Sequence, residues 1–275
     1  MKNEKERKQK QKREAKLPHI SYSELKNWCH CPFYHKLVNI DKIKVFEGNE
    51  YTAFGTAIHA VCESMLIEKD MANDDAGNIF TEQFRKELQD LGNDELKKEL
   101  VVSMARQAKL IIPEVYSALD EYFGEYEVVS TEEKLYEPID GIDDYLFKGF
   151  IDLVVKTADG KYHIIDWKTC SWGWNSKKRS DKMILYQLVL YKHYYCKKHD
   201  IEPENIEIHF ALLKRTAKSN IIELFKVTSG NKRTNNALDL LYRAIKTIKN
   251  KVHIKNRLSC TAGYGCELYK TKYCK

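Results

Sequence analysis

Three residues of chemically active types lie close together in the sequence. The stretch "GFIDLVV" carries Asp152, and "HIIDWKT" carries Asp166 and Lys168. Residues two apart in a strand face the same side, so Asp166 and Lys168 would point together, with Trp167 opposite. Clustered carboxylates need a compensating cation, and oxygen ligands suit Mg²⁺ or Mn²⁺. A lysine beside them could orient a water or stabilise charge on a phosphate, which is the chemistry of phosphodiester hydrolysis.

These three residues alone allow a second interpretation. An aspartate and a lysine at the end of a strand also form ordinary ion pairs that serve no reaction. The elements that would position the side chains therefore matter as much as their types.

The surrounding sequence predicts a sheet with helices after it. Residues 125–139 and 145–157 are rich in β-branched and aromatic residues, and "ADG" at 158–160 is typical of a tight turn. The turn would make the strand ending at 157 an antiparallel neighbour of "KYHIIDWKT", with Asp152 near the level of Asp166. A helix over 180–198 follows, on which Gln187 and Tyr191 share one face. Strands at 206–216 and 220–228 and a helix over 231–251 complete the pattern.

The residues before this sheet are predicted to be helical. Residues 21–37 have helical spacing interrupted by Pro32, which predicts a broken helix or a helix pair. A strong helix is expected within 51–70, a turn at 73–78, and two helices over 79–123, the second beginning near Asn93.

Composition sets limits on the class of protein. The chain has 275 residues, 43% of them hydrophobic, and a net charge of +6, which permits a polyanionic partner without requiring one. No apolar run could span a bilayer, and the lysine-rich residues 1–16 lack the apolar core of a secretory signal. We expect a cytoplasmic protein that does not bind membranes. We expect residues 1–18 to be a basic, disordered tail, either solubilising or phosphate-seeking.

Taken in order, the motifs resemble the PD-(D/E)XK nuclease superfamily, in its RecB-like branch, which includes CRISPR-associated exonucleases. The resemblance runs from about residue 21 to the end and rests on "SYSELKNWCHCP", "GTAIHA", "GFID", "DWK" and "QLVLY". It implies an α/β fold with a restriction-endonuclease-like core, in which helices flank a mixed central sheet. An N-terminal helical region and a cysteine-bearing C-terminal tail would join that core.

The resemblance also implies roles for particular residues. Asp152, Asp166, the backbone carbonyl of Trp167 and His59 would bind Mg²⁺ or Mn²⁺. Lys168 would position or activate the attacking water, so Asp152, Asp166 and Lys168 would form the catalytic set. On the following helix, Gln187 and Tyr191 would bind or orient the nucleic-acid strand. For His59 alone, a packing role is the simpler alternative.

Cysteines near the two ends form a second candidate site. In part of the same branch, one N-terminal and three C-terminal cysteines hold a [4Fe–4S] cluster, which here would be Cys31, Cys260, Cys266 and Cys274. Cys29 is an alternative to Cys31. The C-terminal spacing differs from the common pattern of the family, so zinc or unliganded thiols are alternatives.

The loop between Lys168 and the next helix could contact the substrate. It contains cations that could pair with phosphates and two tryptophans, both expected to be exposed in this polar loop, that could stack on unpaired bases. These residues are Trp172, Trp174, Lys177, Lys178 and Arg179. Lys214 and Arg215 are further cationic candidates at a strand end.

Together these features predict a metal-dependent DNA nuclease, with DNA ends or single strands favoured and an exonuclease expected by analogy. Such proteins serve recombination, repair or phage replication. The alternatives are a structure-specific endonuclease, a non-catalytic nucleic-acid-binding protein, and a subunit that works with a helicase or recombination partner. The expected organisation is a tail at 1–18, a helical region at 19–123, a nuclease core at 124–255 and a Cys-rich tail at 256–275 that packs with the N-terminal region.

Overall fold

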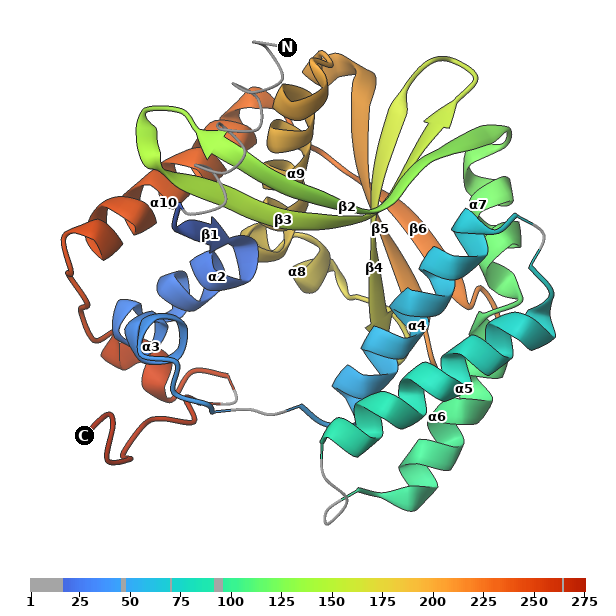
Figure 1. Ribbon diagram of the computed structural model, residues 1–275, viewed down its shortest axis with the longest axis horizontal. Helices are drawn as coiled ribbons and strands as arrows, with labels where there is room; N and C mark the ends of the chain where they lie inside the picture. Colours follow the sequence, from blue (N-terminus) through green and yellow to red (C-terminus); the bar gives the residue numbers. More distant parts are fainter. Residues whose placement is uncertain (1–16, 46–47, 70, 92–95, 264) are drawn as a thin grey trace, which may run out of the picture. The chain divides into compact units, whose positions relative to one another are not determined.

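The computed structural model describes residues 17–45, 48–69, 71–91, 96–263 and 265–275 (Figure 1). Its described residues divide into two units, each assembled from separate parts of the chain. The first unit lies within Met1–Val45, Lys134–Gly149 and Asn231–Lys275, and the second within Phe46–Glu133 and Phe150–Gly230. Residues 1–16 of the tail expected at 1–18, and the helix start expected near Asn93, lie outside the described residues.

One sheet contains the acidic motifs, in strand segments that belong to the second unit. Strand β3 (Ile142–Thr157) pairs antiparallel with β4 (Tyr162–Cys170), which pairs parallel with β5 (Ile206–Lys214), which pairs antiparallel with β6 (Ile222–Val227). Strand β2 (Tyr126–Ile139) pairs with β3. Gly160, at a φ of 83°, makes the tight turn between β3 and β4 because glycine adopts this conformation without steric cost. The sheet is therefore mixed, as expected.

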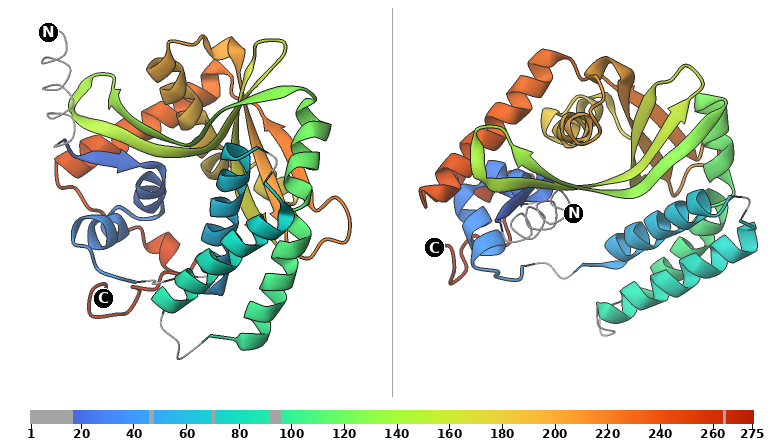
Figure 2. Two further views of the ribbon diagram at one scale, coloured as in Figure 1. Left: turned by 45° about the vertical axis from the view of Figure 1, so that its right-hand side comes forward. Right: turned by 45° about the horizontal axis from the view of Figure 1, so that its top comes forward.

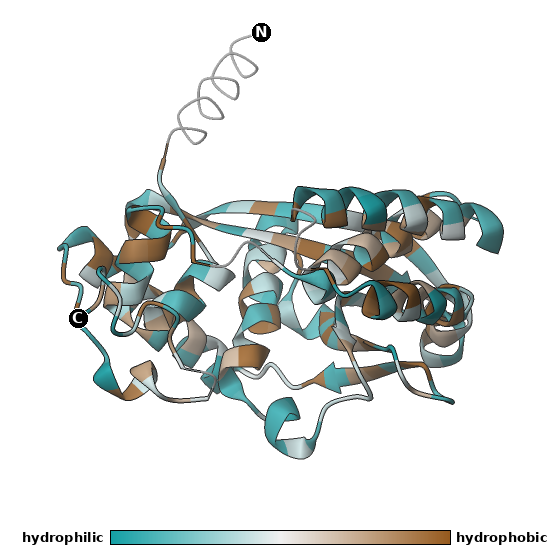
Figure 3. Cartoon of the chain, turned by 90° about the horizontal axis from the view of Figure 1, so that it is seen from below, coloured by the Kyte–Doolittle hydropathy of each residue, from teal (hydrophilic) through white to brown (hydrophobic). Residues whose placement is uncertain are grey.

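Four helices pack on one another and on one face of this sheet. They are α4 (Glu50–Ile67), α5 (Asn73–Asp90), α6 (Lys98–Ile111) and α7 (Glu114–Phe123), and α4 and α5 run side by side (Figures 1 and 2). In α5, apolar side chains recur every four residues and enter the core: Ala76, Phe80, Phe84 and Leu88. Hydrophobic and hydrophilic stretches alternate along the helices in Figure 3, as expected for helices with one buried face.

The chain between β4 and β5 forms two α-helices, before a short 3₁₀ helix. A short helix, α8 (Ser176–Arg179), precedes α9 (Lys182–His199), whose cap is the side chain of Asp181. Helix α9 packs against β4 and β5. It thereby brings Gln187 and Tyr191 to the sheet.

The first unit contains the N-terminal helices and the tail. Strand β1 (His19–Ser21) pairs parallel with β3 at Leu146–Lys148, and α2 (Tyr22–His30) packs against α10 (Asn231–Lys249). Cys31 separates α2 from α3 (Pro32–His35), so the break expected at Pro32 is present. The remaining elements are a π-helix over Lys36–Ile40 and the 3₁₀ helices Pro203–Asn205, in the second unit, and Arg257–Cys260, in the first.

Two local expectations are wrong. Residues 73–78 begin helix α5 instead of forming a turn, because Asp74 and Asp75 in the first turn stabilise a helix N-terminus. Residues 79–123 fall into three helices, since Pro113 cannot continue α6 and instead precedes α7. The mixed sheet with flanking helices nevertheless confirms the α/β, restriction-endonuclease-like fold class. Among the described helices, none is both long and apolar enough to cross a membrane.

Candidate active site

The β3–β4 hairpin places the two carboxylates together. Leu153 pairs with Ile165, so the next position along the antiparallel pair sets Asp152 opposite Asp166, on the same face of the sheet. Asp152 Oδ2 also accepts a hydrogen bond from the backbone N–H of Trp167 at 2.8 Å. The Trp167 side chain is buried in the core on the other face.

Asp166 is buried and held from two sides. Its Oδ2 lies 2.5 Å from Lys168 Nζ, and its Oδ1 accepts a hydrogen bond from Gln187 Nε2 at 2.8 Å. Burial, together with the charge of Asp152, raises the pKa of Asp166 to about 6, against the lowering effect of Lys168. The buried carboxylate of Asp166 is therefore harder to ionise than a free aspartate, even with Lys168 beside it.

His59 approaches the carboxylates from helix α4. Its Nδ1 lies 3.6 Å from Asp152 Oδ2, and its side chain is partly exposed. Burial would lower the pKa of His59, but its contact with Asp152 and the charge of Asp166 raise it above the ordinary value. A capping box between Asn49 and Thr52 fixes the start of the helix that carries this histidine.

Helix α9 contributes the remaining predicted pair. Gln187 Nε2 lies 3.4 Å from the hydroxyl of Tyr191, one helical turn away. Tyr191 is buried, and burial together with the charge of Asp166 raises the pKa of its hydroxyl. The phenol is therefore neutral at pH 7 and can donate a hydrogen bond. The structure thus brings together His59, Asp152, Asp166, Lys168, Gln187 and Tyr191.

This donor set fits a hard divalent cation. His59 Nδ1 lies beside Asp152 Oδ2, and the charge of Asp152 adds to burial in raising the pKa of Asp166, so a cation bound there would offset both effects. Asp152, Asp166 and His59 are the side chains that could hold Mg²⁺ or Mn²⁺.

Two further carboxylates near this site were not identified from the sequence. Burial and the charges of Asp152 and Glu63 raise the pKa of Glu132, and His59 lowers it. Glu63 lies one turn after His59 on α4, so helical spacing could have indicated it. Glu132 has a φ of 46° within β2, and no sequence pattern marks that irregularity.

The loop after β4 separates the two tryptophans. Trp172 is 79% exposed, whereas Trp174 is only 8% exposed and packs on Phe210 and Phe225, with ring centroids 5.0 and 6.0 Å away. The expectation that both rings are exposed is therefore wrong for Trp174. Phe210 on β5 and Phe225 on β6 cover the apolar surface of this ring.

The cations of this loop also divide into two kinds. Arg179 pairs with Glu223 at 2.5 Å and donates to the backbone carbonyl of Trp174 at 2.9 Å, so it fastens the loop to β6. It does not provide a free charge for a phosphate. Lys177 and Lys178 are exposed, and the Lys178 ammonium lies 4.7 Å from the centre of the Trp174 ring.

The strand-end cations Lys214 and Arg215 are also engaged within the fold. Lys214 is buried with its ammonium 3.5 Å from Glu223. Arg215 donates to Gln107 at 3.2 Å and stacks over the ring of Tyr51.

The predicted cysteines belong to the first unit. Cys31 Sγ accepts a hydrogen bond from the backbone N–H of Asn256 at 3.2 Å, and Cys260 Sγ lies 3.8 Å from the carbonyl of the same residue. Cys274 packs with Leu37 and Leu268, with Cys266 against the same cluster. Among the described residues, no three of these sulfur atoms lie within 4.8 Å of one another.

Comparison with solved structures finds chains of similar fold. A proposed exonuclease from Eubacterium rectale aligns with a TM-score of 0.58 and 18% identity, over 94% of this chain and 88% of that chain. SSO0001 aligns with a TM-score of 0.33 and 14% identity, over 71% of this chain and 86% of its own. LHK-Exo, solved in complex with dAMP, aligns with a TM-score of 0.30 and 12% identity, over 74% of this chain and 94% of its own. Among curated proteins, none matches the sequence.

Comparison with protein families gives a match over nearly the whole sequence. The model of the PD-(D/E)XK nuclease superfamily matches residues 19–272, a range that contains every residue of the site described above. The chain belongs to the PD-(D/E)XK nuclease superfamily.

Proposed function

We propose that this protein is a Mg²⁺- or Mn²⁺-dependent deoxyribonuclease that hydrolyses phosphodiester bonds. The observation that carries the proposal is the register of the hairpin, which ends with Leu153 opposite Ile165 and so sets Asp152 beside Asp166, with Lys168 Nζ 2.5 Å from Asp166 Oδ2. Membership of a nuclease superfamily supports the reaction class.

Each residue has a definite task in this reaction. Asp152, Asp166, His59 and the carbonyl of Trp167 would hold the ion, which when bound lowers the pKa of the attacking water and stabilises charge on the phosphate. Lys168 positions the water through its ammonium group. Gln187 keeps Asp166 in place, at 2.8 Å.

The preferred substrate is DNA with ends or single-stranded segments, degraded as an exonuclease. Two observations support this choice. A solved protein of the same fold is described as a proposed exonuclease. The exposed ring of Trp172, in the loop that follows β4, can stack on an unpaired base. Recombination, repair and phage replication are processes that use such an activity, alone or with a helicase.

The substrate preference can be tested with matched DNA molecules. Linear single-stranded, linear double-stranded and closed circular DNA of one sequence are incubated with the protein and Mn²⁺, beside Lys168→Ala. An exonuclease degrades the linear forms and leaves circles intact, whereas cutting of circles would show an endonuclease. Binding without cleavage of any form would favour the non-catalytic alternative. Equal degradation by Lys168→Ala would contradict the assigned site.

We further propose that Cys31, Cys260, Cys266 and Cys274 bind a [4Fe–4S] cluster, with zinc as the alternative. The contact of Cys31 and Cys260 with one residue, Asn256, supports a common site. Four sulfurs around one zinc ion would lie about 3.8 Å apart, whereas among the described residues no three of these sulfur atoms lie within 4.8 Å of one another, so the larger cluster is favoured. Anaerobically purified protein should be brown, absorbing near roughly 400 nm, and Cys31→Ser should lose this absorbance. A colourless protein that contains zinc would support the alternative.

A further inference from the structure

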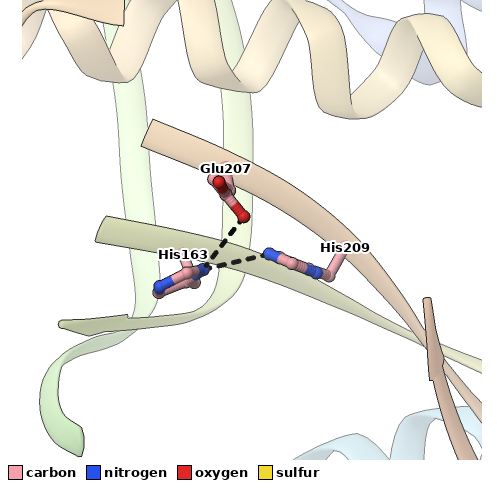
Figure 4. Close-up of side chains that lie close together, drawn as sticks. All are labelled: His163, Glu207 and His209. Carbon is pink, nitrogen blue, oxygen red and sulfur yellow. Dashed lines mark hydrogen bonds and ion pairs between the residues drawn. The ribbon is translucent and has the colours of Figure 1, made fainter. Parts of the chain in front are cut away.

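A second group of metal-binding residue types lies on the same strand as Asp166 but on its other face. His163 is three residues before Asp166 on β4, and side chains three apart in a strand point to opposite faces. The parallel register sets His163 beside Glu207 and Ile165 beside His209 on β5. The two histidines and Glu207 therefore share the face opposite to the nuclease carboxylates. Figure 4 shows the three side chains, with dashed lines from His163 to Glu207 and to His209.

The ligand atoms of this group already face one another. His163 Nδ1 lies 3.1 Å from His209 Nε2 and 3.9 Å from Glu207 Oε2, and one atom from each residue lies within 4.8 Å of the others. Two nitrogens bound to one tetrahedral zinc ion lie about 3.3 Å apart, so the imidazole pair is spaced for a shared ion. Among the described residues, no other His, Cys, Asp or Glu group meets this spacing.

The outer nitrogen of each histidine has its own partner. His163 Nε2 lies 3.0 Å from Thr157 Oγ1, and His209 Nδ1 lies 3.3 Å from the hydroxyl of Tyr122. If these outer nitrogens donate their N–H to the hydroxyls, both inner nitrogens are left as lone-pair donors. Metal-binding histidines are held in this way in proteins.

The surroundings favour neutral imidazoles and leave one carboxylate oxygen available. Burial lowers the pKa of both His163 and His209, the latter to about 3, so both rings are uncharged at pH 7. Lys226 and Lys161 lie 2.7 and 3.4 Å from Glu207 Oε1, whereas Oε2 faces His163. The residues line a pocket of about 470 Å³ that also contains Tyr122 and Phe123, with room for a water as fourth ligand.

We propose that His163, Glu207 and His209 form a separate site for one zinc-type transition-metal ion. Nitrogen donors with one carboxylate suit zinc, whereas the oxygen-rich nuclease site suits Mg²⁺ or Mn²⁺. The ion links β4 to β5 at the end of the sheet where Tyr122 of α7 also packs. It is a structural site that takes no part in phosphodiester cleavage.

Zinc stoichiometry tests the site directly. The parent protein carries Asp152→Asn and Asp166→Asn, which exclude metal binding at the nuclease site. Its thiols are blocked and its metal removed; it is then loaded with Zn²⁺, and the bound zinc is measured after excess Zn²⁺ has been removed. We expect one equivalent per chain, lost in His163→Gln/His209→Gln and kept in the matched control His199→Gln. Zinc at the same level in the double-histidine variant would overturn the proposal, as would no bound zinc in the parent.

Two milder substitutions keep the test decisive if the histidine variant fails to fold. Glu207→Gln should weaken zinc binding at least about tenfold. Lys226→Met should strengthen it, because it removes an ammonium that competes for the Glu207 carboxylate. A histidine pair that is only hydrogen-bonded would give neither response, and unchanged zinc affinity in both variants would contradict the proposal.

Discussion

Gln187 on helix α9 donates a hydrogen bond to Asp166 on strand β4 at 2.8 Å, and the same amide lies 3.4 Å from the Tyr191 hydroxyl. The helix that follows the acidic strand therefore holds one of its two carboxylates. This contact explains how a buried aspartate keeps a fixed orientation beside Lys168.

Replacing Gln187 should show how much its hydrogen bond to the buried Asp166 contributes to stability. In Gln187→Leu, Asp166 Oδ1 loses its donor, so the free energy of unfolding should fall by about 1–3 kcal/mol and the pKa of Asp166 should rise further. Chemical denaturation at pH 7 measures the first effect. Gln83→Leu is the matched control, because Gln83 donates to Glu87 on the surface of α5, at 2.7 Å, and should change stability by at most about 0.5 kcal/mol. Equal effects of the two substitutions would mean that the buried contact is unimportant.

Lys168 should affect the reaction more than substrate binding. Without its ammonium the water loses its positioning group, so the cleavage rate of Lys168→Ala should fall at least about 100-fold. Single-turnover cleavage of end-labelled DNA measures the rate, and filter binding in Ca²⁺ measures the affinity, which should change little. Lys86→Ala is the control, since Lys86 is exposed on α5 and is not among the residues proposed to contact DNA. A loss of affinity that accounts for the whole rate effect would place Lys168 in binding instead.

Replacing Trp172 should weaken DNA binding, whereas replacing Trp174 should lower the stability of the protein. Trp172→Ala should weaken binding of single-stranded DNA by about 1–3 kcal/mol and leave stability unchanged, because its ring is exposed. Trp174→Ala should lower the free energy of unfolding by about 3–5 kcal/mol, because its ring packs between Phe210 and Phe225. Fluorescence anisotropy and denaturation measure the two effects. Unchanged DNA affinity in Trp172→Ala would exclude the stacking role.

Acid should destabilise the metal-free protein through His209. Its pKa is lowered from 6.5 to about 3 in the folded state, mainly by burial. Below pH 6.5 the unfolded chain therefore binds a proton that the folded chain does not, and stability falls with pH until about pH 3. Between pH 6.5 and pH 5 the loss from this group is roughly 2 kcal/mol. Denaturation in a chelator should show a shallower pH dependence in His209→Gln than in His199→Gln, and identical curves would contradict this assignment.

The sequence was sufficient to predict the carboxylate pair because the determinants are local. A tight turn at 158–160 fixes the β3–β4 register within a few residues, so the level of Asp152 relative to Asp166 follows by counting. The i, i+4 spacing of Gln187 and Tyr191 is likewise a local property of a helix. Most strands and helices were also predictable, from β-branched and aromatic content and from helical spacing, whereas the mixed sheet was implied only by the resemblance to the nuclease superfamily.

What the sequence did not reveal depends on pairing between distant segments. His163 and His209 are 46 residues apart, and the register of two parallel strands joined through α9 cannot be counted from a turn. The burial of Trp174 likewise depends on Phe210 and Phe225, which reach it from β5 and β6. Glu132 was not predicted to lie near the site, because a left-handed backbone position within a strand has no sequence pattern.

The central claim is that Asp152 and Asp166 share one divalent ion. The most direct measurement is Mn²⁺ titration followed by electron paramagnetic resonance, in a His209→Gln background that excludes the second site. Asp152→Asn and Asp166→Asn should each weaken the same Mn²⁺ site by at least about 100-fold, since each removes a charged ligand from it. If the parent binds no Mn²⁺, or if either substitution leaves the affinity unchanged, the two carboxylates do not share an ion and the account is wrong.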